Sequence, residues 1–261
     1  MSDQTLQRTL EAYREIVDSP RNRQAATLWQ GAPGVVYDFT KFRSHPRPLC
    51  DIGGRPPIVS CLDGVTYGEL LGFTLNEFYD TPETYLLNLL RARIYYYNLV
   101  EDDTYFEPLI PLWFGLGHEA TFFGLQLIYG ADAEPWVELR RVIEGPDDLA
   151  KLSFPDFKSS GVMPKALRFY ETISRLVEPY AMTVAFLDWI RAPLGMSIYL
   201  RGLDSITVDM VERPSFARAI FDFIVESHAR WCEQRAEYLG EPTPKVVIDN
   251  DEVNVDRKSV V

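Results

Sequence analysis

A chain of 261 residues, 46% of them hydrophobic, is long enough to bury a sizeable core within one large domain. Its formal net charge of -12 argues against nucleic acids and anionic membranes as partners. The N-terminus is polar, and no run approaches the roughly 18 apolar residues of a membrane span. We therefore expect a cytoplasmic protein that does not cross a membrane.

The first elements are helical. Leu6, Leu10 and Tyr13 fall at helical spacing, which predicts an amphipathic helix over residues 3–18, and a second short helix is expected over 23–30. Residues 43–57 are rich in Pro and Gly and predict a loop that leads into a short strand at 58–61.

The middle of the chain alternates between helix and strand. Thr81 followed by Pro82 is typical of a helix start, and this helix is expected to end near Asn98. The apolar run 108–114 predicts a buried parallel strand, followed by a glycine turn and a short helix from His118. Residues 127–129 form another candidate strand, and a helix is expected from Met163 to near 179.

The last third repeats a recognisable unit. A strand at 182–187 precedes a loop at 191–202, a long amphipathic helix runs over 214–239, and a further strand follows at 245–249. Strand, functional loop, helix and strand form the repeating unit of a parallel α/β barrel, whose chemistry lies at the carboxyl ends of the strands.

Four segments in order carry a family resemblance. Residues 55–69 place Arg-Pro-Pro-Ile before a glycine, residues 114–124 read FGLGHEATFFG, residues 192–202 run from Ala-Pro-Leu through a Tyr to a Gly, and residues 203–252 hold an Asp, a Pro-capped helix and an acidic strand end. This series resembles the uroporphyrinogen decarboxylase (URO-D) superfamily, which includes the decarboxylase and the corrinoid:coenzyme methyltransferases. The resemblance implies a (β/α)8 TIM barrel.

The departures from the decarboxylase pattern are specific. Cys61 and Val65 stand where the decarboxylase has two arginines that hold substrate carboxylates, and Gly115 stands where it has an essential Asp. A thiol, an isopropyl group and a bare backbone cannot neutralise several carboxylates. Only the tyrosine of that site is retained, as Tyr199, so uroporphyrinogen decarboxylation is not expected.

The methyltransferase branch is similar in having a zinc site of the form His-x-Cys with a later Cys. None of His45, His118 and His228 has a Cys two positions later, and the segment that would bring the zinc ligands is absent. The three cysteines show no Cys-x-x-Cys spacing either. We therefore assign no metal ligands, and a corrinoid remains the candidate cofactor implied by the resemblance.

The expected barrel is incomplete. About five of the eight βα units of such a barrel fit into residues 55–261, preceded at 1–54 by N-terminal helices and the Pro/Gly-rich loop. The chain thus looks C-terminally shortened. Open barrel edges need cover, which the N-terminal helices, a second chain or a homodimer would provide.

The candidate catalytic residues are Tyr199, His118 and Asp249. The candidate substrate-binding residues are Glu119, Asp188, Asp251, Glu252 and Asn254. Each has a plainer interpretation: Tyr199 as a packed helix residue, Glu119 as a complement to a helix dipole, and the 249–254 cluster as a solvated acidic turn rather than a general base or a cation site.

Two functions follow from these residues. One is a methyltransferase-like enzyme that acts on a small methylated substrate or a corrinoid protein at the carboxyl mouth of the barrel. The alternative is a non-catalytic or partner-completed half barrel, a truncated or decayed relative.

Overall fold

The computed structural model describes residues 3–30, 58–241, 246–248 and 253–255. They form two compact units, each assembled from separate stretches of the chain. The first unit comprises residues 1–112, 130–134 and 169–186, and the second comprises residues 113–129, 135–168 and 187–261. The predicted boundary between residues 54 and 55 lies outside the described residues.

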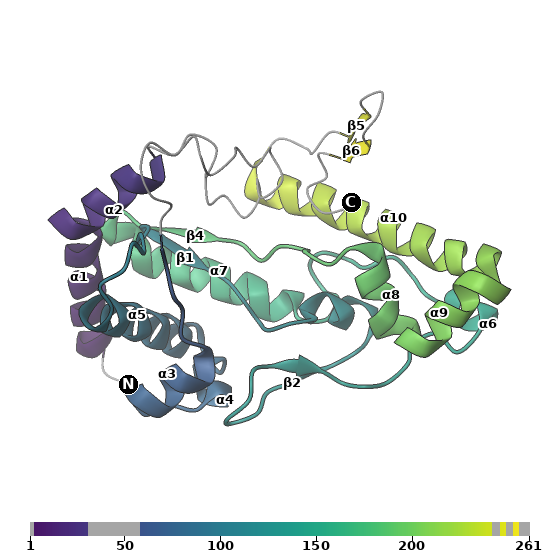
Figure 1. The fold of residues 1–261 in the computed structure, drawn as a ribbon, viewed down its shortest axis with the longest axis horizontal. Helices are drawn as coiled ribbons and strands as arrows, with labels where there is room; N and C mark the ends of the chain where they lie inside the picture. The colour runs from purple at the N-terminus through teal and green to yellow at the C-terminus, as the bar shows by residue number, and fades with distance from the viewer. Residues whose placement is uncertain (1–2, 31–57, 242–245, 249–252, 256–261) are drawn as a thin grey trace. The chain divides into compact units, whose positions relative to one another are not determined.

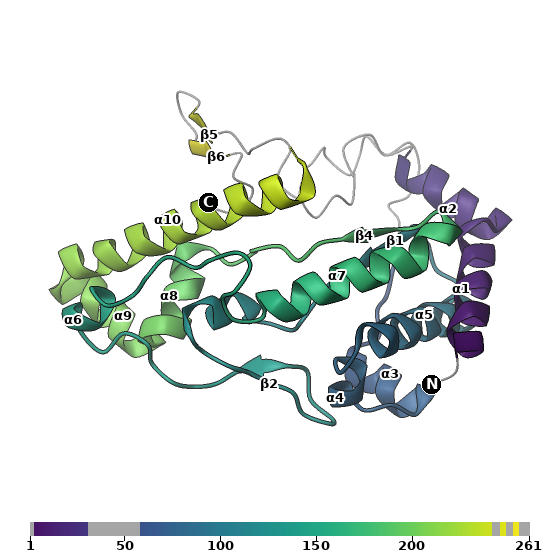
Figure 2. The ribbon, with the colours of Figure 1, turned by 180° about the vertical axis from the view of Figure 1, so that it is seen from behind.

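Helices dominate the first unit. They are α1 (Asp3–Val17), α2 (Pro20–Gln30), α3 (Gly64–Leu71), α4 (Leu75–Phe78), α5 (Pro82–Leu99), and the short 3-10 helix η3 (Glu178–Tyr180). Helix α1 packs against α5, and α3 and α4 lie beside α5 (Figures 1 and 2). Tyr13, Leu86 and Leu90 are fully or almost fully buried, which accounts for the apolar spacing along α1 and α5.

Local caps fix where these helices begin. The Asp63 carboxylate accepts from Thr66 N at 2.7 Å and starts α3. The Thr81 hydroxyl accepts from Thr84 N at 3.1 Å, and Pro82 occupies the first turn of α5. The predicted start of α5 is therefore confirmed, and its end at Leu99 lies one residue beyond the prediction.

A parallel strand pair forms the sheet of the first unit. Strand β1 (Leu109–Pro111) pairs with β4 (Thr183–Ala185) in the register Leu109 to Thr183. The ladder continues on both sides through Thr183 N to Pro108 O at 2.9 Å and Leu112 N to Ala185 O at 3.0 Å. The predicted parallel strands are confirmed, but shorter than expected. A full barrel is not shown.

The second unit also consists mainly of helices. Its helices are the 3-10 helix η2 (His118–Phe123), α6 (Pro146–Leu149), α8 (Pro193–Arg201), α9 (Leu203–Glu212) and α10 (Pro214–Leu239). It also contains two antiparallel strand pairs. Strand β2 (Leu127–Ile128) pairs with β3 (Trp136–Val137), and β5 (Val246–Ile248) pairs with β6 (Val253–Val255). Helix α7 (Met163–Val177) begins in this unit and continues into the first. The aromatic core of the second unit consists of Phe122, Phe157, Trp189 and Trp231.

Three sequence predictions are wrong. Residues 58–61 form no strand, because their backbone bonds instead to acidic side chains: Ile58 N to Asp103 and Ser60 N to Asp102. The stretch 191–202 is mostly helix α8 rather than a loop, because Pro193 stands at its first turn and the good helix formers Leu194, Met196, Leu200 and Arg201 outweigh Gly195. Strand β5 pairs antiparallel with β6, so it is part of a hairpin and not of a parallel ladder.

Candidate active site

The second unit brings together two segments that follow the parallel strands. The chain leaves β1 and reaches His118, and it leaves β4 and reaches Asp188 and Arg191. His118 Nε2 lies 2.9 Å from the carbonyl oxygen of Asp188, which joins the two segments directly. The carboxyl ends of parallel strands thus supply neighbouring groups, as the barrel resemblance implies.

His118 is fully buried, with an acceptor at each ring nitrogen. Nδ1 lies 3.2 Å from Gly115 O, and Nε2 faces Asp188 O. Carbonyl oxygens only accept, so both contacts are hydrogen bonds only when both ring nitrogens carry protons. Glu119 Oε2 also lies close to this ring, 3.7 Å from Nδ1.

Glu119 has one satisfied and one unsatisfied oxygen. Its Oε1 accepts from Ile190 N at 3.1 Å and from Arg191 N at 3.2 Å. Its Oε2 is buried and has no hydrogen-bond partner among the described residues. The side chain is only 1% exposed, so this oxygen is a buried acceptor.

Arg191 and Tyr199 complete the cluster. Arg191 Nε lies 3.8 Å from Glu119 Oε2 and is itself buried without a hydrogen bond in the described part of the chain. Its guanidinium covers the Tyr199 ring at 4.5 Å, a cation–π contact. Burial raises the pKa of the Tyr199 phenol, with Glu119 acting in the same direction and Arg191 against it. The phenol therefore keeps its proton at neutral pH and is a donor.

Two glycines let these groups approach one another. Gly117 has a φ of 84°, and a Cβ there would lie 3.2 Å from Tyr199 Cε1. Gly115 has a φ of 97°, and a Cβ there would lie 2.6 Å from Pro135 Cβ and 2.7 Å from Pro135 O. A side chain of any kind therefore has no room at Gly115 in this fold, and the position requires glycine.

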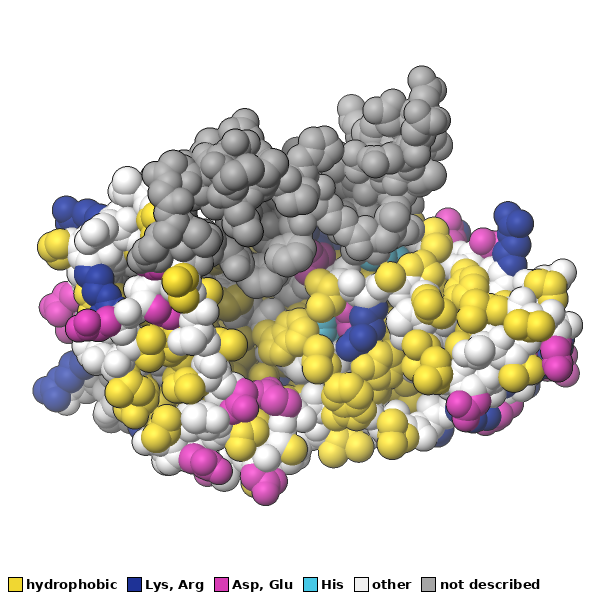
Figure 3. Space-filling model, viewed as in Figure 1, with side chains coloured by type: hydrophobic (Ala, Val, Ile, Leu, Met, Phe, Trp, Pro, Cys, Tyr) yellow, Lys and Arg dark blue, Asp and Glu magenta, His cyan; other side chains and the backbone are white. Residues whose placement is uncertain are grey.

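Apolar side chains surround the cluster on the surface. Trp136 lies 6.1 Å from Tyr199 between ring centroids. Leu116, Trp136 and Leu194 are each more than two-fifths exposed although they are apolar. Figure 3 shows hydrophobic side chains gathered over β2 and α8. A ligand at the cluster would therefore meet an apolar rim around a buried charged centre, the usual composition of a small-molecule site.

Four predicted residues meet in this cluster: Tyr199, His118, Glu119 and the backbone of Asp188. The Asp188 carboxylate accepts from Trp189 N at 3.0 Å and has further interactions. Asp249, Asp251 and Glu252 lie outside the described residues, and Asn254 lies within β6, where only the backbone is described. Their site roles stay predictions.

Sequence reasoning missed Arg191 and Trp136. Arg191 is the first residue of the predicted loop 191–202 and directly precedes the segment that carries the family resemblance, a position that could have drawn attention to it. Trp136 lies in β3, and no motif of the sequence marks it.

The described residues contain neither a metal-binding cluster nor a helix of membrane-spanning character. No group of three or more His, Cys, Asp or Glu side chains there is placed to hold a metal ion. Within the same residues, no helix is long and apolar enough to cross a membrane.

Comparison with known proteins assigns no family. Neither a protein-family model nor a curated protein matches the chain. Among solved structures, a methyltransferase from Methanosarcina mazei resembles it with a TM-score of 0.49 and 17% sequence identity, over 69% of this chain and 50% of that one. The chain thus spans about half the length of this neighbour, and a likeness at this level assigns no activity.

Proposed function

We propose that the chain is a methyltransferase-type enzyme that binds a small methylated molecule at Glu119, Arg191 and Tyr199. The observation that carries the proposal is the buried Glu119 Oε2, which has no hydrogen-bond partner among the described residues and lies next to Arg191 Nε, equally without one. The methyl-transfer chemistry comes from the URO-D resemblance of the sequence, and the cluster supplies the site for it.

Glu119 Oε2 and Arg191 Nε, which lack hydrogen-bond partners among the described residues, define which groups the ligand must carry. Glu119 Oε2 needs a donor, and Arg191 Nε needs an acceptor. A hydroxyl, thiol or amine group does both, since it donates through its hydrogen and accepts through its lone pair. A substrate that carries a methyl group near such a heteroatom would satisfy both atoms, with the methyl group on the apolar rim formed by Trp136 and Leu194.

Tyr199 is suited to deliver a proton in this reaction. When a nucleophile takes the methyl group, the carbon–heteroatom bond breaks and its electron pair stays on the heteroatom. That heteroatom then takes the proton of the Tyr199 phenol, and solvent returns a proton to the phenolate. General acid catalysis of this kind contributes roughly a hundredfold or more. Glu119, held by two backbone N–H groups, orients the substrate and does not move.

For the methyl acceptor we propose a corrinoid carried by a partner protein. The described residues do not fit the zinc site of the methyltransferase branch, because they include no suitable group of metal ligands. A corrinoid on a partner protein fits the exposed apolar residues Leu116 and Trp136, which could pack against a flat macrocycle. It would supply the nucleophile.

The test uses the purified chain with free reduced cobalamin and methanol, methylamine or methanethiol as methyl donor. The visible absorbance of the corrinoid is the readout. We expect turnover with one of these donors, a loss of about a hundredfold in Tyr199→Phe, and an apparent affinity for the donor at least about tenfold weaker in Glu119→Gln. Tyr180→Phe, at a partly exposed tyrosine, and Glu226→Gln, at an exposed glutamate, serve as matched controls.

A different result would contradict the proposal. Turnover that persists unchanged in both variants would remove Glu119 and Tyr199 from the mechanism. No change of absorbance with any donor favours the second candidate, a partner-completed half barrel. That candidate is supported by β1 and β4, which pair only with each other within the described residues and leave both outer edges of their sheet open.

A further inference from the structure

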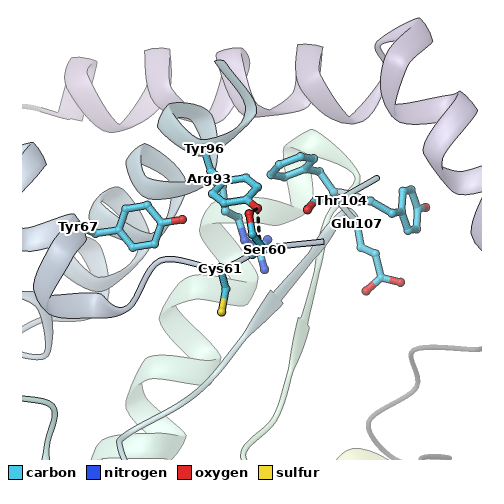
Figure 4. A pocket seen from close by; sticks show the side chains of 9 residues that line it. Ser60, Cys61, Tyr67, Arg93, Tyr96, Thr104 and Glu107 are labelled. Atoms are coloured by element: carbon cyan, nitrogen blue, oxygen red, sulfur yellow. Dashed lines mark hydrogen bonds between the residues drawn. The ribbon is translucent and has the colours of Figure 1, made fainter. Parts of the chain in front are cut away.

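The first unit contains a separate pocket of about 260 Å³. It lies between the 58–61 segment, helices α3 and α5, and residues 104–107, and its lining includes Cys61, Tyr67, Arg93, Tyr96 and Glu107 (Figure 4). None of these residues belongs to the candidate active site, which lies in the second unit. The volume suits a small metabolite rather than a nucleotide or a peptide.

Arg93 brings a positive charge into this pocket. Its Nη1 donates to the Tyr13 hydroxyl at 2.9 Å and to Leu109 O at 2.8 Å, which anchors the side chain. Its Nη2 and Nε make no hydrogen bond, and the guanidinium makes no ion pair, with any described residue. An anchored guanidinium with two N–H directions left open is well suited to hold a carboxylate.

Tyr67 supplies a second donor. Burial raises the pKa of its phenol to about 12, with Tyr96 and Cys61 acting in the same direction. The hydroxyl is therefore protonated at neutral pH, and it makes no hydrogen bond to any described residue. Figure 4 shows this hydroxyl pointing toward the side of the pocket where Arg93 lies.

The opposite charge is also present. Glu107 lines the pocket, and Asp102 lies behind its wall, where it accepts from the Tyr96 hydroxyl at 2.6 Å and from Ser60 N at 2.9 Å. Despite partial burial, these hydrogen bonds lower the pKa of Asp102 to about 2, so it is ionised at neutral pH. With the Glu107 carboxylate in the lining and Asp102 bonded to two lining residues, the pocket disfavours a ligand whose only charge is negative.

Aromatic rings occupy the remaining wall. Tyr67, Tyr96, Tyr105 and Phe106 all line the pocket. Ring faces attract ammonium groups, and more strongly where water is excluded. A ligand with a positive end therefore finds both carboxylate charge and aromatic faces in the same small space.

We propose that this pocket binds a small zwitterion of the amino acid class. Its carboxylate lies against Arg93 and the Tyr67 hydroxyl, and its ammonium group lies toward Glu107 and the aromatic rings. The site is independent of the proposed methyl transfer, because it shares no residue with the cluster around Glu119.

Isothermal titration calorimetry with norvaline and two analogues that each lack one of its charged groups tests this assignment. L-norvaline carries both charges, pentanoate only the carboxylate, and butylamine only the ammonium group. We expect norvaline to bind at least about tenfold more tightly than either of the others, since each charged contact contributes roughly that factor.

Two variants localise the binding. Arg93→Gln and Tyr67→Phe should weaken norvaline binding by at least about tenfold and about threefold, respectively. Arg91→Gln is the control, since Arg91 lies on the same helix and donates to Leu71 O and Asn88 instead. If circular dichroism shows that Arg93→Gln is unfolded, the test depends on Tyr67→Phe. This variant should fold normally, because the Tyr67 hydroxyl makes no hydrogen bond to any described residue.

Three outcomes would overturn the proposal. They are pentanoate binding as tightly as norvaline, no heat with any probe at millimolar concentration, and norvaline binding that is unchanged in Tyr67→Phe and in a folded Arg93→Gln.

Discussion

Replacing Asp209 by Asn should destabilise the second unit by roughly 3 kcal/mol, the lower end of the cost of breaking a buried ion pair. Asp209 lies in α9 and is fully buried. Its Oδ2 lies 2.8 Å from Arg201 Nε, and its other oxygen pairs with Arg213. The destabilisation lies at the lower end of that range because Arg201 keeps other acceptors: its Nη1 donates to Ile143 O at 3.2 Å and to Glu144 O at 2.9 Å.

Urea unfolding followed by tryptophan fluorescence measures this cost, since Trp189 and Trp231 lie in the same unit. Asp222→Asn is the matched control, because its pair with Arg218 spans 3.8 Å and both side chains are mostly exposed. Such surface pairs contribute little. A free energy of unfolding of Asp209→Asn at pH 7 equal to that of the control would refute the reasoning.

The stabilisation that the Asp209 carboxylate provides should depend on pH. Burial alone would raise the pKa of Asp209, but the hydrogen bonds and charges of Arg201 and Arg213 outweigh it, so its pKa lies below the usual value. A lowered folded-state pKa stabilises the protein fully above the unfolded-state pKa of about 3.9. The contribution is lost as the pH falls from there through the folded-state pKa, so the difference between wild type and Asp209→Asn should shrink over that window.

One further prediction concerns the neighbourhood of His118. Gly115→Ala should cost roughly 2–4 kcal/mol, from left-handed strain and the clash with Pro135. Gly124→Ala is the control, because Gly124 has a φ of 91° and nothing lies within 4 Å of the added Cβ, so it should cost only the strain of roughly 1–2 kcal/mol. Thermal unfolding of both variants checks this, and equal shifts would show that the Pro135 contact is not limiting.

Part of the candidate site could be predicted from the sequence. Tyr199, His118 and Glu119 were identified because they lie in segments that resemble family signatures and because functional residues follow strands in parallel folds. Their mutual distances could not be predicted, because residues 119 and 191 are far apart in the sequence and meet through tertiary contacts. These include the pairing of β1 with β4 and the contact between His118 and Asp188 O. The pocket around Arg93 had no signature at all, because its lining comes from four separate stretches of the chain.

The sequence by itself determined the long helices α1, α5, α7 and α10, and tertiary structure decided the strands and the sites. Helix α5 begins directly after Thr81 and helix α10 ends directly before Gly240, because caps and left-handed glycines act within one turn of the chain. Residues 58–61 have strand composition, yet their N–H groups bond to Asp102 and Asp103, since a strand exists only where a partner strand is placed beside it. The same holds for Glu119 Oε2: its burial and its lack of a hydrogen-bond donor among the described residues are properties of packing, which no local pattern encodes.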